Sequence, residues 1–347
     1  MSEEREILLG TAQRVFAELA VAERLTESEA GVWHSDGWRM IEDAGLALAL
    51  VPEEKGGFGV APTDALAVVR LAGAAALPFP LAETMICNRL LALVGLTPLG
   101  GVVSLSQGAA EETLSLSRDD GRWQVSGRLL RVPWGRWADH VVAAADDRIV
   151  CMPRNVMKVA AGSNLAGEPR DDVLVDGYLS MDHVADAPRA GQLLRRAGAA
   201  MRSIAIAGAI QRMLAMTTTY AGERVQFGKP IGKFQTIQQY LAVLAGQSAA
   251  AVAAADLAAD AVAAGLSALP IAVAKTRAGE AAGLVAALAH QIHGAIGFTY
   301  EHPLQRLTRR AWSWRDEFGG EAEWSSAIGR EVCAVGADGL WSLAVRI

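Results

Sequence analysis

The sequence has few cysteines, no lysine-rich run and no cysteine pair at metal-binding spacing. Its three cysteines, Cys87, Cys151 and Cys333, are far apart and form no CxxC motif. This spacing argues against a disulfide framework or a zinc site, so we predict no metal ion. The formal net charge is −6, without a basic cluster. The sequence therefore lacks the cluster of positive charge that is typical of nucleic-acid-binding proteins.

Uninterrupted apolar segments of membrane-spanning length are also lacking, although 52% of the residues are hydrophobic. The most apolar stretches, 204–216 and 241–265, are short or are interrupted by Gln247, Asp256 and Asp260. Alanine is only weakly hydrophobic, whereas a spanning helix needs about 20 predominantly apolar residues. The N-terminus, MSEEREILLG, begins with acids and lacks the basic and apolar segments of a secretory signal. We expect a cytoplasmic protein that does not enter a membrane.

The spacing of apolar residues changes twice along the 347-residue chain, which is long enough for more than one domain. Residues 1–98 and 189–347 follow a helical period, whereas 99–188 contain short alternating runs separated by Asp119-Asp120-Gly121 and Asp146-Asp147, two predicted hairpin turns. We predict a mostly α, α+β protein with an N-terminal helical domain, a central small antiparallel β domain and a C-terminal four-helix bundle. The four bundle helices are expected over 193–226, 234–264, 269–290 and from Gly319 or Glu321 onward.

The segment YAGERVQFGKPIGKFQTIQQ, residues 220–239, contains the first candidate binding site. It places Arg224 and Gln226 at the expected end of one helix, and the next helix begins at Phe234-Gln235. Free amides at a helix N-terminus close to an arginine suit an anionic phosphate. The alternative is a plain helix-turn-helix corner with a solvated arginine. No GxGxxG or Walker motif is present, so a nucleotide would be held in another way.

A second segment, QIHGAIGFTYEHPLQ, follows at residues 291–305. Gly294 and Gly297 come directly after a predicted helix and would let a ligand or another backbone approach closely. The alternative is a glycine-rich helix end in which His293 is a packing residue.

Both segments, together with WRMIEDAGLALALVPEEKGGFG at residues 38–59, resemble the acyl-CoA dehydrogenases, and the resemblance covers essentially the whole chain. It implies a dimer or tetramer, of one or two kinds of chain, with FAD at the subunit interfaces. The implied substrate is an acyl-CoA thioester, and the implied electron acceptor is a flavin-containing protein. In the implied reaction a carboxylate removes the α-proton, the β-hydride passes to the flavin, and hydrogen bonds to the thioester carbonyl stabilise the negative charge.

The resemblance also assigns roles to individual residues of the two segments. It implies that Arg224 and Phe227, with Gln235, contact the FAD diphosphate and adenosine across a subunit interface, beside Gln226. It further implies that Gln291, Gly294 and Gly297 line the FAD pyrophosphate of a neighbouring chain. One cofactor would then be shared between two chains.

The sequence departs from the family pattern in two places. In the β domain, LSQGAAEET at 105–113 and RVPWG at 131–135 replace the usual flavin-contacting loop and strand, and Pro133 lacks both the hydroxyl and the amide expected there. The two usual positions of the catalytic base fall on Phe318 and Met201. Glu317, next to Phe318, is therefore the candidate base.

The stretch WRDEFGGEAEW, residues 314–324, contains four carboxylates, and a structural role competes with the catalytic one. Asp316 or Glu317 near a helix N-terminus, with Glu321 and Glu323 in its first turn, would stabilise the helix dipole. The surrounding arginines could pair with these acids, face CoA phosphates or form a solvated basic face; they are Arg306, Arg309, Arg310 and Arg315.

Four functional hypotheses follow. The leading one is a subunit of a heteromeric acyl-CoA dehydrogenase acting on a bulky substrate, with the base on a partner subunit. The second is a homotetramer that uses Glu317. The third is a structural subunit without a cofactor, and the fourth is a flavin monooxygenase of the same fold, which needs no α-proton base.

Overall fold

A computed structural model of the chain describes residues 3–108 and 111–345. The chain divides into two compact units, each with its own internal contacts. Unit 1 comprises Met1–Val68 and Leu77–Met201, and unit 2 comprises Val69–Ala76 and Arg202–Ile347. The division into three domains at 98/99 and 188/189 stays a prediction.

Unit 1 begins with helices, several of which start at or directly after a proline or end within two residues of a glycine. The helices are α1 (Glu3–Leu19), α2 (Ala22–Glu29), α3 (Ser35–Asp43), α4 (Pro62–Ala75) and α5 (Leu81–Leu93). Pro62 is the first residue of α4, a position where its missing amide costs no hydrogen bond. The last residues of α4 belong to unit 2. The helical N-terminal part is therefore confirmed.

The rest of unit 1 consists of two four-stranded sheets. Their strands are β1 (Val103–Leu105), β2 (Thr113–Asp119), β3 (Arg122–Pro133), β4 (His140–Ala145), β5 (Arg148–Pro153), β6 (Met157–Ala160), β7 (Arg170–Leu179) and β8 (Val184–Asp186). The strand orders are β1-β4-β5-β8 and β2-β3-β7-β6. All pairs are antiparallel except β1 with β4, which is parallel. Both predicted hairpin turns are present, with positive φ at Asp120, Gly121 and Asp146.

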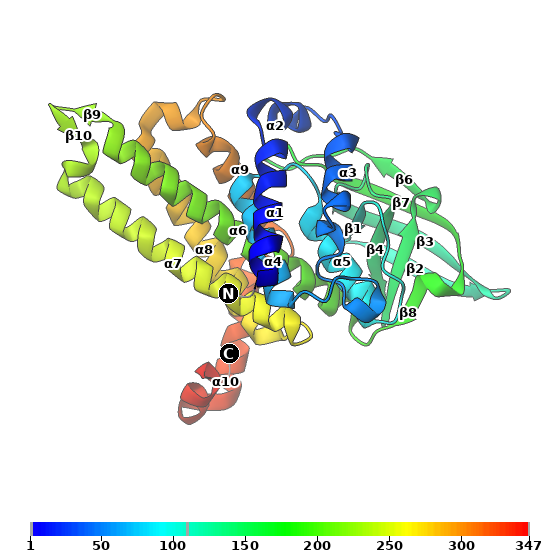
Figure 1. Cartoon of the computed structure of the whole chain (residues 1–347). Helices are drawn as coiled ribbons and strands as arrows, with labels where there is room; N and C mark the ends of the chain where they lie inside the picture. Colours follow the sequence, from blue (N-terminus) through cyan, green and yellow to red (C-terminus); the bar gives the residue numbers. More distant parts are fainter. Residues whose placement is uncertain (1–2, 109–110, 346–347) are drawn as a thin grey trace. The chain divides into compact units, whose positions relative to one another are not determined.

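Unit 2 is built mainly from long helices, shown in green, yellow, orange and red in Figure 1. They are α6 (Ala190–Glu223), whose first residues belong to unit 1, α7 (Gln235–Ala263), α8 (Ala268–His293), α9 (Leu304–Asp316) and α10 (Glu321–Ala344). Close helix packing depends on glycine: a Cβ at Gly208 would lie 1.9 Å from the carbonyl oxygen of Arg70. The helical bundle is confirmed, and α10 begins at the predicted Glu321. Helix α9 was not among the expected helices.

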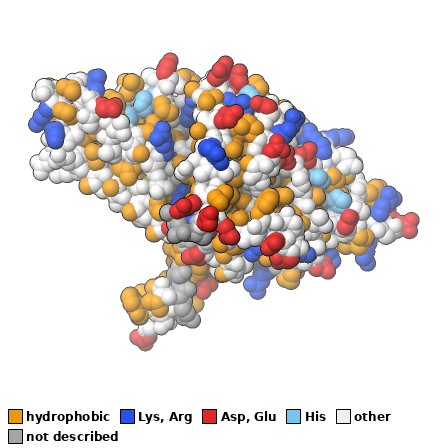
Figure 2. Space-filling view, viewed as in Figure 1, with side chains coloured by type: hydrophobic (Ala, Val, Ile, Leu, Met, Phe, Trp, Pro, Cys, Tyr) orange, Lys and Arg blue, Asp and Glu red, His pale blue; other side chains and the backbone are white. Residues whose placement is uncertain are grey.

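Helices α7 and α8, the latter extended to Phe298, are long and apolar enough to cross a membrane by length and composition. The core helices of soluble proteins meet the same criteria, and α7 and α8 contact each other within unit 2. Figure 2 shows acidic and basic side chains interspersed over the viewed face.

Candidate functional site

The carboxylate of Glu317 is buried and paired with an arginine. Glu317 follows the last residue of α9, with extended backbone angles, and the residue is only 6% exposed. Its Oε2 accepts a hydrogen bond at 2.6 Å from Nε of Arg202, a residue of α6 that is 3% exposed. If Glu317 took up a proton, Arg202 would remain as an unbalanced buried cation, which is energetically costly. The ion pair therefore opposes a role for Glu317 as a general base.

A buried lysine holds the backbone on both sides of Glu317. Lys275 of α8 is 1% exposed, and its Nζ donates hydrogen bonds to the carbonyl oxygens of Arg315 and Gly319, the latter at 2.8 Å. Burial lowers the pKa of Lys275 to about 8, although the carboxylates of Glu321 and Glu317 oppose this shift. Carbonyl groups at the end of α9 thereby gain a cationic donor.

Phe318, which the resemblance aligns with the usual base position, adopts a left-handed conformation with φ 56°. This conformation is strained for a residue other than glycine and persists only when its surroundings hold it. The Arg202 guanidinium lies over the Phe318 ring at 5.6 Å and over the Trp314 ring at 6.0 Å. The indole Nε1 of Trp324 donates to the Phe318 carbonyl oxygen at 3.1 Å. The turn that would carry a base is thus fixed by aromatic and cationic contacts.

The other acids of this stretch have structural surroundings. Glu321 begins α10 and pairs with Arg315 at 2.5 Å, and Glu323 lies in the same first turn, as the structural alternative predicted. Asp316 is the exposed last residue of α9. Glu317, however, follows α9 and does not cap α10, whose N-cap is Gly320. The helix-capping interpretation therefore holds for Glu321 and Glu323 but is wrong for Glu317.

The predicted diphosphate-binding segment 224–235 forms an exposed hairpin between α6 and α7. The strands β9 (Val225–Gln226) and β10 (Lys229–Pro230) pair through a two-residue turn in which Phe227 and Gly228 both have positive φ. This is the geometry of a tight hairpin turn. Helix α6 therefore ends at Glu223, not at Gln226 as predicted, because the hairpin takes over the backbone hydrogen bonding.

The side chains predicted to bind the cofactor in this segment are exposed to solvent. Phe227 is 92% exposed, and Arg224, Gln226 and Gln235 are also exposed. Within residues 3–108 and 111–345, no hydrogen bond or ion pair engages the side chains of Arg224, Gln226, Gln235 or Gln291. They remain available to a ligand or to another chain.

The second predicted segment, 291–297, contains two glycines with different surroundings. Gly294 is exposed, has φ 66°, and a Cβ added to it would meet nothing within 4 Å. A Cβ at Gly297, in contrast, would lie 3.0 Å from Cβ of His293 and 3.2 Å from Nδ1 of His290. Gly294 and the exposed Gln291 can meet a ligand, whereas Gly297 allows the short helix η6 (Gly294–Phe298) to pack against α8.

Tyr220 brings the two segments together within unit 2. Its hydroxyl donates to the carbonyl oxygen of His293 at 3.3 Å, and the two rings stack with centroids 4.5 Å apart. His293 is 4% exposed and His290 is 5% exposed, and burial is the largest cause that lowers the pKa of each. The packing role expected for His293 is what the structure shows. Tyr220 itself was not singled out from the sequence, because its contact lies 73 residues away.

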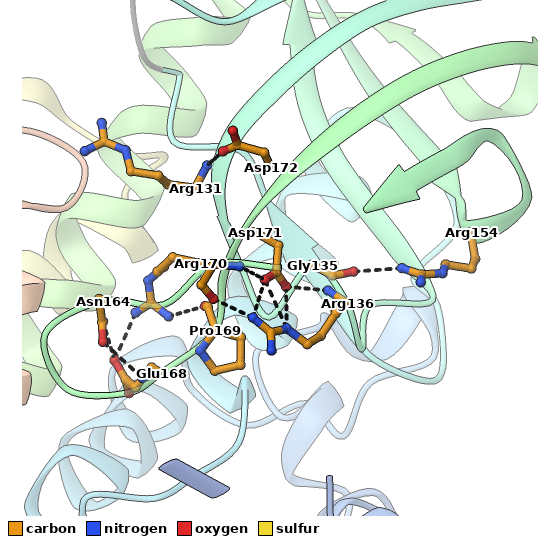
Figure 3. A network of polar contacts seen from close by, with 11 residues as sticks. Arg131, Gly135, Arg136, Arg154, Asn164, Glu168, Pro169, Arg170, Asp171 and Asp172 are labelled. Atoms are coloured by element: carbon orange, nitrogen blue, oxygen red, sulfur yellow. Dashed lines mark hydrogen bonds and ion pairs between the residues drawn. The ribbon is translucent and has the colours of Figure 1, made fainter. Parts of the chain in front are cut away.

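Segment 130–136 of the β domain departs from the family pattern, and its backbone polar groups form hydrogen bonds within the chain. The amide of Leu130 donates to Glu112, that of Arg131 to Asp172, and that of Arg136 to Asp171, at 3.1, 3.1 and 2.6 Å. Figure 3 shows Asp172 of β7 beside the backbone of Arg131, and Asp171 of β7 beside Arg136. Asp171 is fully buried.

The carbonyl groups of the same segment are also engaged. Those of Arg131, Pro133 and Gly135 accept hydrogen bonds from Gln107, Ser104 and Arg154, respectively. Of the loop 105–113, Ala109 and Ala110 lie outside the described residues. The residues around 130–136 therefore do not fit a flavin ring held by backbone hydrogen bonds. Segments 224–235 and 291–294, in contrast, leave exposed the side chains that the resemblance assigns to the phosphate and adenosine side of FAD.

Comparison with known proteins agrees with this architecture. A family model for "Acyl-CoA dehydrogenase, C-terminal domain" matches residues 194–325. The acyl-CoA dehydrogenase IpdE2 of Mycolicibacterium smegmatis is 31% identical over 316 residues, covering 90% of this chain and 93% of that protein. The IpdE2 protein of Mycobacterium tuberculosis is 30% identical over 319 residues, covering 89% and 91%.

Solved structures share the fold at lower identity. The ChsE4–ChsE5 complex from Mycobacterium tuberculosis matches with a TM-score of 0.83 and 21% identity, over 97% of this chain and 99% of that chain. A steroid acyl-CoA dehydrogenase of Tcur3481 and Tcur3483 matches with a TM-score of 0.85 and 23% identity, over 94% and 97%.

Helices, small sheets and a helical bundle in this order form the fold that this chain shares with the two solved structures. The chain belongs to the acyl-CoA dehydrogenase family. The family assignment, the fold class and dehydrogenation of acyl-CoA thioesters as the family reaction are thereby confirmed.

Proposed function

We propose that this chain is one subunit of a heteromeric acyl-CoA dehydrogenase and that it lends nucleotide contacts to FAD held mainly by a partner subunit. The buried Arg202–Glu317 ion pair is the observation that carries the proposal, because it occupies the carboxylate next to Phe318, the residue that the resemblance aligns with the usual base position. The partner would supply the base. This arrangement agrees with the name of a structural relative, which is a complex of two different chains.

The proposed roles of the two subunits follow from which polar side chains of this chain are exposed. Arg224, Gln235 and Gln291 are exposed and would bind the diphosphate and adenosine, with the Arg224 guanidinium as the charge-assisted donor. FAD, when bound, accepts the β-hydride of the thioester. The partner would remove the α-proton in a dry pocket, where burial raises the pKa of a carboxyl group toward working pH.

The remaining assignments complete the proposal. The substrate would be a bulky acyl-CoA, as the name of the steroid acyl-CoA dehydrogenase suggests, and the electrons would pass to a flavin-containing acceptor protein. We place the complex in the cytoplasm.

The test is a purified native complex, recovered through a tag on this chain and assayed by dye reduction with acyl-CoA thioesters. We expect about one FAD for each pair of unlike chains, and Glu317→Gln should leave kcat within about twofold of wild type, because the carboxylate is not the base. Loss of about a hundredfold or more in kcat for Glu317→Gln, with unchanged FAD content, would place the base on this chain.

A further inference from the structure

Three of the six histidines of the chain lie together in unit 2, around the segment 294–303 that joins α8 to α9. The rings of His293 and His302 have centroids 4.9 Å apart. His290, one turn before His293 on α8, is stacked on Phe298 of η6 with centroids 4.0 Å apart. The three imidazoles thus contact the joining segment or belong to it.

The hydrogen bonds of His293 require a neutral ring. Its Nδ1 lies 2.8 Å from the carbonyl oxygen of Ala289, which can only accept, so Nδ1 carries the proton. The other ring nitrogen, Nε2, is buried and has no hydrogen-bond partner in the part of the chain that the structure describes. A second proton on this ring would create a buried cation with an unsatisfied N–H group, which is energetically costly.

His290 is held in the same way. The hydroxyl of Thr308 donates to the carbonyl oxygen of Gln305 at 3.2 Å, so it accepts from Nε2 of His290, which lies 2.9 Å from it. The Nδ1 of His290 is therefore the nitrogen without a proton. Among the described residues it has no hydrogen-bond partner, and a Cβ at Gly297 would lie 3.2 Å from it. A proton added there would be buried against η6 without an acceptor.

The third ring, that of His302, accepts a hydrogen bond at the start of a helix. The amide of Leu304, the first residue of α9, donates to Nδ1 of His302 at 3.2 Å. This bond satisfies one of the amides that a helix leaves free at its N-terminus. A proton on Nδ1 would break the bond and would place a positive charge where the helix dipole disfavours it.

The charged groups of the adjoining elements do not offset a charge on these rings. Glu301 and Glu223 are exposed, and Tyr220 donates its hydroxyl proton to the carbonyl oxygen of His293. Helix α9 adds positive groups, which repel a protonated ring; they are Arg306, Arg309 and Arg310. Burial is the largest cause that lowers the pKa of all three histidines, and a charge on His302 lowers the pKa of the other two further.

We infer that His290, His293 and His302 form a proton-sensitive latch that holds the segment 294–303 against α8 and α9 while all three rings are neutral. Proton uptake by any of them opens the segment, because each ring then loses a hydrogen bond or gains an unsatisfied donor. Since the resemblance assigns Gly294 to FAD, loss of FAD in acid is a further consequence. That consequence rests on the proposed function, whereas the latch itself does not.

Hydrogen exchange of the full chain without FAD tests the latch, followed by mass spectrometry at pH 7.5 and pH 5.5 and corrected for the intrinsic effect of pH. Opening should increase about tenfold for each histidine that is neutral when closed and titrates near pH 6.5 when open. We expect at least about a tenfold increase for segment 294–303 and less than about twofold for β3 in unit 1. Equal increases in both would indicate general acid destabilisation and would overturn the inference.

Histidine variants that cannot take up a proton identify the groups responsible. His302→Asn keeps an acceptor for the Leu304 amide, and His293→Asn keeps a donor for the Ala289 carbonyl group. Each should reduce the acid-induced increase about tenfold. His183→Asn, which alters a histidine of unit 1, is the matched control and should behave as wild type. If His293→Asn does not fold, His302→Asn decides alone, because an increase equal to that of wild type would overturn the inference.

The native complex separates the latch from the proposed function. Wild type should release FAD between pH 7.5 and pH 5.5, measured by flavin fluorescence, and His302→Asn should retain more of it. Opening of segment 294–303 in acid without release of FAD would contradict the proposed contact with the cofactor and would leave the latch standing. Release of FAD without opening of this segment would overturn the latch.

Discussion

Two groups of segments that the family resemblance assigns to one active site differ in what their polar groups do. The open segments, 224–235 and 291–294, expose their candidate side chains to solvent, and Phe227 is 92% exposed. The closed segments, 130–136 and 315–319, direct their amides, carbonyl groups and the Glu317 carboxylate to partners within the chain. Exposed polar groups can bind a ligand at low cost, whereas closed ones must first be uncoupled.

The difference separates two kinds of sequence change. Where the chain keeps the family motif, the structure leaves the side chains accessible. Where it departs from the motif, the polar groups form hydrogen bonds within the chain: Arg202 donates to the Glu317 carboxylate, and the Leu130 amide donates to Glu112. Changes in closed segments should therefore cost stability, and changes in open segments should cost cofactor affinity without loss of stability.

The largest effect is expected from Arg202→Met, which removes the arginine that hydrogen-bonds to the buried Glu317 carboxylate. The free energy of unfolding should fall by about 3–5 kcal/mol, measured by urea unfolding followed by circular dichroism. Arg202→Met with Glu317→Gln should recover a large part of this loss. Arg330→Met, which alters an exposed arginine of α10, should change stability by less than about 0.5 kcal/mol. Equal stabilities for Arg202→Met and Arg330→Met would show that segment 315–319 is not closed by this pair.

A second effect concerns Lys275 and pH. Its pKa in the folded chain is about 8, below the ordinary lysine value of 10.5, so between these values the unfolded chain binds more protons and stability rises with pH. The stability advantage of wild type over Lys275→Met should therefore be constant below pH 8 and grow by about 3 kcal/mol up to pH 10.5. Urea midpoints across this range provide the measurement. A difference that stays constant would mean that Lys275 is not held as a buried cation.

Local turns were predictable from sequence, whereas the distant charge partners were not. Asp120-Gly121 belongs to a turn whose residue types favour positive φ, and the structure confirms it. Helix α9 was missed because its arginines suggested a solvated face, yet Arg310 is 2% exposed and donates to the carbonyl oxygen of Ala76. The apolar spacing of Leu304, Leu307, Ala311 and Trp314 was the available signal for this helix.

The candidate site shows the same limit. The two nucleotide-side motifs are continuous in sequence, so their residues could be named in advance. Glu317 could be named too, but its partner Arg202 lies 115 positions earlier. Pairings over such distances depend on helix offsets, which no periodic pattern specifies.

A smaller effect, on binding alone, is expected from Arg224→Gln in an open segment. In the native complex the affinity for FAD should fall about ten- to a hundredfold, because a charge-assisted hydrogen bond to phosphate is lost. The Tm of the chain without FAD should stay unchanged, since Arg224 is exposed. Arg212→Gln, which alters an exposed arginine of α6, the helix that ends just before Arg224, is the matched control. Equal FAD affinities for the two variants would show that Arg224 does not contact the cofactor.

The most direct test of the division between open and closed segments is the flavin absorbance of this chain purified alone after incubation with excess FAD and gel filtration. We predict close to zero FAD per polypeptide, because the amides of Leu130, Arg131 and Arg136 and the carbonyl groups of Arg131, Pro133 and Gly135 already form hydrogen bonds within the chain. A value near one FAD per polypeptide would contradict the account and would make a self-sufficient oligomer with Glu317 as its base the better explanation.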